Sequence, residues 1–255
     1  MENLEKLLGE IYRIYEKHEK EAEEKGEFFN IFEVISVGHR EAIHSNFLAE
    51  LLNPNGSHRK GNDFLLLFLK EINGVCLINR DKIQCGSIDI KENWFNKENT
   101  KIETEKHLGR KEKLKGGRVD IAIESPNCDI FIENKIWAGE QNNQLIRYDK
   151  GLNKGKEAKY LLYLTLDGKE ADSVKEDKDV IYAPISYSGH ILNWLEKCQI
   201  SLENNQSNQT LKKILTQYIV LIRKLTNQPR SKEMGEDYIK TIFEGNNLTS
   251  YLIMV

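Results

Sequence analysis

The sequence predicts a mixed α/β domain with a helical N-terminus. Short apolar runs of strand length lie at residues 119–123, 130–136 and 159–166. Longer segments repeat apolar residues at helical spacing, most clearly over residues 2–25 and 210–226. No internal repeat or low-complexity linker divides the chain. We therefore expect one domain over residues 1–255, with its core at about 40–200, a helical N-terminal extension at 1–37 and a helical C-terminal part at 205–255.

The composition is typical of a soluble protein with a modest core, because 39% of the 255 residues are hydrophobic and 30% are charged. No apolar run reaches the ~18 residues needed to span a bilayer, and the acidic, amphipathic N-terminus argues against a secretory signal. The four cysteines are scattered without a C-x-x-C pair, which indicates reduced thiols rather than a zinc site. We therefore expect a cytoplasmic protein with no membrane partner. The net charge of −3 means that any nucleic-acid binding must depend on local basic patches.

Three helices are expected before the first clear strand. Residues 2–25 carry an apolar stripe and a charge-rich second half, which is typical of an amphipathic helix. Residues 40–53 form the second helix, which ends at the turn Asn53-Pro54-Asn55-Gly56. Residues 62–72 are apolar nearly all round, so this third helix should be deeply buried.

A hairpin with a long tip should follow. Residues 74–99 have only a weak apolar pattern, which predicts one short strand at 75–78. In residues 100–108 apolar and polar residues alternate, which predicts a strand that ends at Gly109. Gly116 and Gly117 then lead into the strand at 119–123, so residues 109–117 form the tip. The remaining pattern predicts strands at 159–166 and 179–185, and helices at 140–152, 188–198, 210–226 and 237–243.

Charged residues interrupt two of the apolar strands. Asp120 lies in the first, and Glu133 and Lys135 lie in the second, two residues apart and so on the same face. Three ionisable groups on largely apolar strands are costly to bury unless they pair with each other or bind a cation. This arrangement indicates either a metal-dependent site or a structural ion-pair cluster, and the three residues alone do not decide between them.

The pattern Asp120…Glu133-x-Lys135 resembles the signature of the PD-(D/E)XK nuclease superfamily, with Val119 in place of the proline. Gln144 and Tyr148, four residues apart on the next helix, look like the QxxxY element of some nuclease branches. Residues 41–48 and 51–54 resemble the N-terminal part of one bacterial branch. The resemblance covers residues from about 38 to about 225.

This resemblance implies a restriction-endonuclease-like core, in which a mixed central sheet is flanked by helices and the site lies where two strands diverge. It also implies a nuclease that uses Mg²⁺, with Mn²⁺ expected to substitute. Asp120 and Glu133 would bind the ion together with the carbonyl oxygen of Asn134, and Lys135 and Gln144 would act in catalysis.

Three further glutamates are candidates for the metal site. Glu41 lies at the start of the second helix, where many members of the superfamily place such a residue, but it can also cap or solvate the first turn. Glu103 and Glu105 lie on the strand before the hairpin tip, and we favour Glu105 as a ligand. Cross-strand ion pairing is the alternative for both.

The hairpin tip is the densest basic stretch of the chain and the expected contact with nucleic acid. Its residues are Arg110, Lys111, Lys113, Lys115 and Arg118, with Tyr148 on the following helix as a further contact. A solvated tip is the alternative, because lysines are common in exposed turns.

We expect DNA rather than RNA as the substrate, and a role in bacterial anti-phage defence or DNA processing. A catalytically silent module of the same fold, which binds nucleic acid or a protein partner, is the competing interpretation. The terminal helices offer a surface for homo-oligomer formation.

Overall fold

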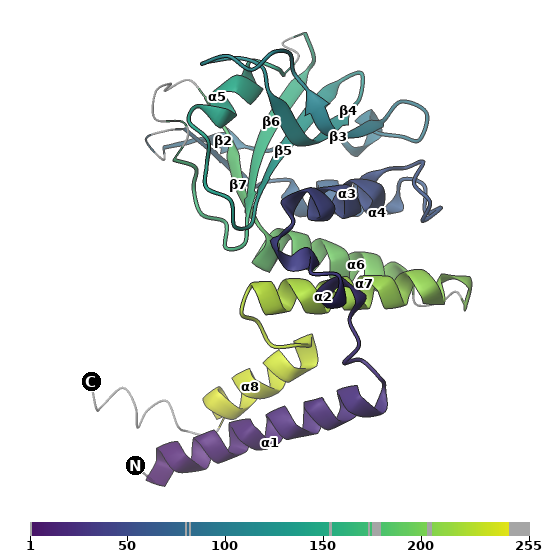
Figure 1. Cartoon of the computed structure of the whole chain (residues 1–255), viewed down its shortest axis with the longest axis vertical. Helices are drawn as coiled ribbons and strands as arrows, with labels where there is room; N and C mark the ends of the chain where they lie inside the picture. The colour runs from purple at the N-terminus through teal and green to yellow at the C-terminus, as the bar shows by residue number, and fades with distance from the viewer. Residues whose placement is uncertain are drawn as a thin grey trace.

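A five-stranded mixed sheet lies at the centre of the computed structural model, which describes residues 2–244 apart from residues 80, 82, 153–154, 173, 175–179 and 203–205. The strand order is β3-β4-β5-β6-β7 (Figure 1). Pairing is antiparallel from β3 through β4 to β5, and parallel from β5 through β6 to β7. The strands are β3 (Lys101–His107), β4 (Arg118–Glu124), β5 (Cys128–Lys135), β6 (Ala158–Thr165) and β7 (Ala183–Ser186). This confirms the predicted α/β class and the mixed sheet.

Helices cover both faces of the sheet because its central strands are apolar on both sides. Ile130 and Ile132 of β5 pack into the larger core with α3 (Glu41–Leu52) and α4 (Asp63–Ile72). Phe131, between them, packs into a smaller core on the opposite face with α5 (Gln144–Asp149). Every residue of β5 is buried, so the charged residues of this strand lie inside the protein.

Two further helical layers lie beyond α3 and α4 (Figure 1). The first contains α7 (Gln209–Leu225) and α6 (Leu192–Ser201), which a π-helical turn (η3, Tyr187–Ile191) joins to β7. The short α2 (Ile31–Val34) packs on α7. The outermost layer is the pair of α1 (Glu2–Glu24) and α8 (Lys232–Glu244), which contact each other along their length (Figure 1). The helical N- and C-terminal additions are thus part of the fold.

Smaller elements complete the described chain. A two-stranded ribbon of β1 (Cys76–Ile78) and β2 (Gln84–Ser87) is joined to residue Tyr182 by one bridge. The short 3₁₀ turns are η1 (Val37–His39), η2 (Glu92–Trp94) and η4 (Gln206–Asn208). Within the described part of the chain, no helix is both long and apolar enough to cross a membrane. All four cysteines are free thiols, as expected.

Some predicted elements have other bounds in the structure, and one strand was not predicted. The helix after β5 begins at Gln144 rather than residue 140, because residues 137–143 form a loop that ends at Asn143 with a left-handed φ of 56°. The strand expected at 179–185 is β7, which begins at Ala183, and residue 179 lies outside the described residues. The strand β2 has no apolar pattern and was not expected. Residues 245–255, the end of the predicted C-terminal part, also lie outside the described residues.

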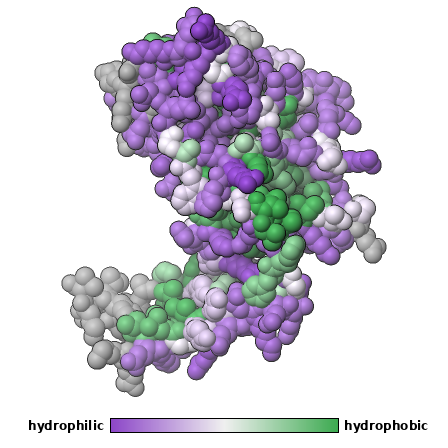
Figure 2. Space-filling view, viewed as in Figure 1, coloured by the Kyte–Doolittle hydropathy of each residue, from purple (hydrophilic) through white to green (hydrophobic). Residues whose placement is uncertain are grey.

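The face of the molecule seen in Figure 2 has a polar and a more apolar region. Over the sheet and its loops it is largely hydrophilic, whereas apolar side chains gather on the lower helices and near the segment that leads into α3 (Figure 2). Large apolar side chains exposed in these regions are Leu4, Leu8, Tyr12, Tyr15, Phe28, Phe29, Val34, Ile35, Ile239 and Phe243.

Candidate active site

The site lies where β4 and β5 separate. Their ladder ends at the pair Ile121 and Ile132, whereas β5 stays paired with β6 as far as Lys135. Asp120 directly precedes Ile121, the last residue of β4 that pairs with β5, and its Oδ2 accepts a hydrogen bond of 2.7 Å from the backbone N–H of Asn134. The carboxylate therefore replaces the missing ladder bond and holds the two strand ends together. This is the divergence of strands that the resemblance implied.

Glu133 is the most deeply buried charged residue of the site, with 1% of its surface exposed. Its Oε1 accepts a hydrogen bond of 2.6 Å from Gln144 and forms an ion pair of 2.7 Å with Lys135. Its Oε2 is buried and has no hydrogen-bond partner among the described residues. A buried carboxylate oxygen without a partner is costly. The free oxygen thus fits a ligand position for a cation, and carboxylate oxygens are what Mg²⁺ prefers.

The pKa of each of the two carboxylates is raised, and burial is the main cause for both. Burial raises the pKa of Glu133 to about 8, and the negative charge of Asp120 adds to this effect. Burial also raises the pKa of Asp120, against the hydrogen bond from Asn134 and the charge of Lys135. A bound divalent cation would act in the opposite direction, because an opposite charge favours the ionised form. The chemistry of this donor set therefore fits a cation site.

Lys135 projects from β5 on the same side as Glu133 and is 8% exposed. Burial acts to lower its pKa, but Glu133, Asp120 and Glu41 outweigh burial and raise it. In the absence of a metal ion Lys135 is therefore a charged ammonium group. Lys135 and Glu133 line a cavity of about 350 Å³ at the strand ends, together with Asp120, Gln144 and Tyr148.

Gln144 and Tyr148 lie one turn apart on α5, so their side chains meet. The side-chain amide of Gln144 donates to Glu133 and also to the hydroxyl of Tyr148, at 2.9 Å. Tyr148 in turn donates to the backbone carbonyl of Arg118. The pair therefore ties α5 to both strands of the site. Tyr148 is only 2% exposed, so in this structure it supports Gln144, and its contact with nucleic acid stays a prediction.

Glu41 reaches the site from α3, on the opposite face of the sheet. Its Oε1 accepts hydrogen bonds from the backbone N–H groups of Ile136, Trp137 and Ala138, at 2.7 to 3.0 Å. This bonding fixes the turn that follows Lys135. Glu41 thus has a positioning role in the structure, and metal binding by Glu41 stays a prediction.

Asn134 faces α3 with its side chain and the site with its backbone. The side-chain amide donates to Ser45 at 3.0 Å and to the carbonyl of Glu41 at 3.2 Å, and it accepts from Tyr187 at 3.0 Å. These bonds fix the peptide unit whose carbonyl is the candidate ligand, while metal binding by that carbonyl stays a prediction.

The two glutamates of β3 have different surroundings. Glu105 lines the cavity of about 350 Å³ and forms an ion pair of 3.1 Å with Arg118. Glu103 forms ion pairs with Lys101 and Lys106 of its own strand, at 2.7 and 3.3 Å. The pair of Glu105 with Arg118 joins β3 to β4, which is the cross-strand pairing of the alternative interpretation. Residues 103 and 106 would face opposite sides of a regular strand, but the left-handed φ of 50° at Glu105 breaks the alternation.

Among the described residues, no three His, Cys, Asp or Glu side chains gather in a ready metal-binding group.

The basic residues of the hairpin tip do not share one environment. Lys111 and Arg118 line the same cavity as Asp120, and Lys111 is bonded to Gln141 at 2.6 Å. Lys113 lines an adjoining cavity, whereas Lys115 forms an ion pair of 3.3 Å with Glu112. The remaining basic residue of the tip, Arg110, is exposed. The structure thus brings part of the tip to the site.

Sequence reasoning missed Arg147, which lies on α5 between Gln144 and Tyr148 and lines the cavity with them. It is 3% exposed and donates a hydrogen bond of 2.6 Å to the carbonyl of Asn142. An arginine on a short helix normally faces solvent, so the residue type of Arg147 did not indicate that its side chain is buried. The only available signal was its position inside the QxxxY element.

A sequence model of the PD-(D/E)XK nuclease superfamily matches residues 29–220, which include every strand of the sheet and all the site residues described above. The chain belongs to this superfamily. Its members are nucleases that generally use divalent metal ions, in agreement with the paired carboxylates of this nuclease-fold protein. A search of curated proteins and a search of solved structures returned no match to it.

Proposed function

We propose that this protein hydrolyses phosphodiester bonds of nucleic acid with Mg²⁺ bound at Asp120 and Glu133. The observation that carries the proposal is the buried Oε2 of Glu133, which has no hydrogen-bond partner among the described residues. Glu133 lines the cavity together with Asp120 and Lys135. The carbonyl of Asn134 is a third ligand in this proposal, and Glu105 or Glu41 an additional one. Mn²⁺ would substitute because it accepts the same oxygen ligands.

The protein's own groups then have distinct tasks. When bound, the divalent cation would lower the pKa of a water molecule and polarise the phosphate. Lys135, held at the cavity wall by Glu133, orients the attacking water and stabilises the negative charge that develops on the phosphoryl oxygens. Gln144 fixes Oε1 of Glu133, which leaves Oε2 for the metal.

DNA is the proposed substrate, ahead of RNA, and we place the activity in the cytoplasm, in bacterial anti-phage defence or DNA processing. Support for a polyanionic substrate comes from the tip of the hairpin, where Lys111 and Arg118 reach the cavity that contains the carboxylates. The whole chain would act as one nuclease domain.

Binding of nucleic acid or a protein partner without cleavage is the second candidate function. The ion pair of 2.7 Å between Lys135 and Glu133 favours it, because a purely structural cluster would contain the same contact. The intact set of Asp120, Glu133 and Lys135 favours hydrolysis.

A panel of single- and double-stranded DNA and RNA, incubated with Mg²⁺, Mn²⁺ or EDTA, tests the two functions against each other. Hydrolysis predicts cutting that EDTA and Asp120→Ala both abolish. A mobility shift without cutting under every condition would support the second function instead.

A further inference from the structure

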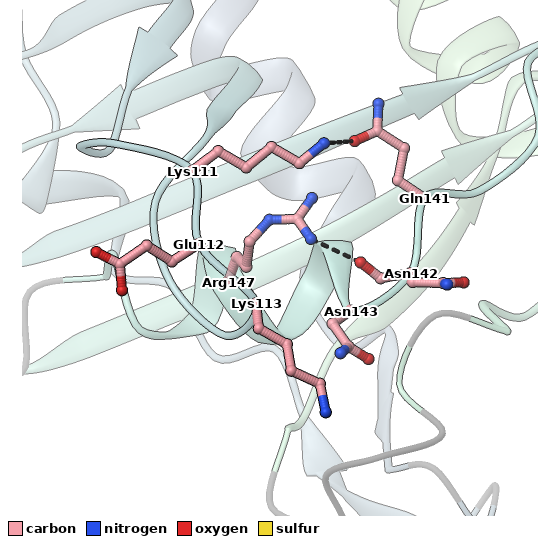
Figure 3. A pocket seen from close by; sticks show the side chains of 7 residues that line it. All are labelled: Lys111, Glu112, Lys113, Gln141, Asn142, Asn143 and Arg147. Carbon is pink, nitrogen blue, oxygen red and sulfur yellow. Dashed lines mark hydrogen bonds between the residues drawn. The ribbon is translucent and has the colours of Figure 1, made fainter.

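A second cavity adjoins the one that contains the carboxylates. It has a volume of about 580 Å³ and lies between the hairpin tip and the loop before α5 (Figure 3). Three residues, Lys111, Gln141 and Arg147, line both cavities, so the two share a wall. The second cavity is completed by Glu112, Lys113, Asn142 and Asn143.

Arg147 gives this cavity a buried cation with unused hydrogen-bonding capacity. The residue is 3% exposed, and its Nε is buried without a hydrogen-bond partner among the described residues. Among the described residues, its Nη1 donates a hydrogen bond to the carbonyl of Asn142. Leaving a guanidinium N–H buried and unpaired is costly unless a ligand accepts from it. A phosphate is the natural acceptor, because its oxygens match the planar fork of an arginine.

The charges at the cavity are predominantly positive. Among the described residues that line it, the charged groups are Lys111, Lys113, Arg147 and one acid, Glu112, which forms an ion pair with Lys115. Figure 3 shows Glu112 directed away from Arg147 and from the loop at residues 141–143. The cavity therefore favours an anion.

The chain fixes the two sides of the cavity relative to each other. Lys111 of the tip bonds to Gln141 of the opposite loop at 2.6 Å (Figure 3). The tip itself closes tightly at Gly116, which has a φ of 74° and where a Cβ would lie 2.1 Å from the carbonyl oxygen of Arg110. Gly117, with a φ of 112°, packs directly on Arg147 and Tyr148. Two adjacent glycines thus allow the tip to lie against the α5 arginine.

We propose that this cavity is a subsite for a non-scissile phosphate of the nucleic-acid substrate, with Arg147 and Lys113 as its main contacts. The inference rests on the proposed function, because the shared wall places a second phosphate of one strand beside the carboxylate site. The bound group is either an internal phosphate or a terminal phosphomonoester, and both present the same oxygens to Arg147.

Binding measurements in an Asp120→Ala background test the subsite without cutting. Lys113→Ala should weaken duplex DNA binding about tenfold and reduce the slope of log affinity against log salt by about 0.9. Lys70→Ala is the control, since this exposed lysine lies on α4 and lines neither cavity, and it should leave affinity and slope unchanged. Equal effects of both variants would overturn the subsite in favour of a diffuse basic surface.

A second readout follows Arg147 itself, because replacement of a buried arginine can disturb folding. In the same background, a 5′-phosphorylated thymidine dinucleotide should shift the NMR signal of the Arg147 Nε–H group, and Arg147→Lys should abolish that signal and weaken binding. A shift only with the 5′-phosphorylated form assigns a terminal phosphate, and a shift also with the 5′-hydroxyl form assigns an internal one. No shift with either form would overturn the proposal.

Failure of the subsite and failure of the proposed function give different results. If the parent protein cuts DNA but Lys113→Ala binds like the parent, the subsite is wrong and hydrolysis stands. If the dinucleotide shifts Arg147 but the parent cuts nothing with any divalent metal, the subsite stands and hydrolysis is wrong.

Discussion

At the scale of single residues, the site depends on how differently the two oxygens of Glu133 are used. One oxygen is bonded to Lys135 and Gln144, and the other is buried and unpartnered among the described residues. The first set of contacts fixes the orientation of the carboxylate, while the second oxygen has the properties of a ligand. Lys135 and Gln144 therefore contribute in different ways, and their variants should differ in kind.

Lys135→Ala should lower cleavage by about 10²–10⁴-fold, the usual contribution of a catalytic acid–base or electrostatic group. Mg²⁺ affinity should hold or rise, because the change removes a cation beside the metal site. Calorimetric titration with Mg²⁺ and single-turnover cleavage would measure the two effects separately. Lost Mg²⁺ binding would instead make Lys135 a structural support.

Gln144→Ala should act through Glu133, since it removes the amide that fixes Oε1. We expect metal affinity or activity to fall about 10–100-fold, as is usual when a group that orients a metal ligand is removed. Tyr148→Phe is the control with the smaller expected effect, because it keeps the ring and removes only the hydroxyl that accepts a hydrogen bond from Gln144. Metal affinity equal to that of the parent in Gln144→Ala would contradict this role.

At the scale of elements, the strands of the site could be predicted from the sequence because β4 and β5 are short, buried apolar runs in which the charged residues stand out. Asp120, Glu133 and Lys135 meet because β4 and β5 are neighbours and the ladder between them ends at Ile121 and Ile132. The start of α5 was predicted four residues early. Its loop is held by contacts with residues distant in sequence, such as the bond between Lys111 and Gln141.

Residues whose position depends on tertiary contacts were harder to predict. The left-handed φ of Glu105 has no local signal, since residues other than glycine rarely adopt it. The three backbone bonds of Glu41 join segments about 95 positions apart in the chain. The burial of Arg147 follows from the hairpin tip that covers it, which a helical pattern does not contain.

The packing of α3 against α7 predicts a dependence of stability on pH. His44 is fully buried and bonded through Nδ1 to the hydroxyl of Tyr218 at 2.7 Å. Burial lowers its pKa from 6.5 to about 4, so the unfolded chain takes up this proton at higher pH than the folded protein does. The contribution to stability is therefore complete above pH ~6.5 and is lost as pH falls to ~4, in total about 3 kcal/mol.

His44→Asn isolates this contribution, because it removes the titrating group and keeps a short polar side chain. Urea unfolding of parent and variant between about pH 7.5 and 4 should give curves that converge as pH falls. The variant should be the less stable protein at neutral pH. A constant difference between the two across this range would show that His44 does not titrate as described.

At the scale of the whole molecule, the helical layers leave an apolar surface away from the site. On α1, Leu8 and Tyr12 are 55% and 59% exposed, and on α8, Ile239 and Phe243 are 58% and 65% exposed. Exposed apolar side chains of this size on one helix pair are typical of an interaction surface. We propose that the terminal helices α1 and α8 join two copies of the chain.

Size-exclusion chromatography with light scattering should then give a mass of twice 29.6 kDa at high protein concentration. Tyr12→Glu combined with Phe243→Glu should shift the protein to the monomer, because it places charge on the apolar surface. Ile83→Glu, at a 60% exposed residue before β2, is the control and should not change the mass. A parent protein that is monomeric at every concentration would exclude self-association by these helices.

Our central claim is that Asp120 and Glu133 together bind a divalent ion that cleavage requires. Asp120→Asn and Glu133→Gln keep the shape of each side chain and remove its charge. Glu124→Gln is the control, since this residue lies on β4 and pairs with Lys106 outside the cavity.

The most direct measurement is Mg²⁺ binding by calorimetry, with cleavage of DNA followed on the same protein preparations. We expect the parent and Glu124→Gln to bind Mg²⁺ and to cut, and we expect Asp120→Asn and Glu133→Gln to lose both properties while remaining folded by circular dichroism. Cutting at the parental rate by either of these two variants, or cutting by the parent in EDTA, would contradict the claim.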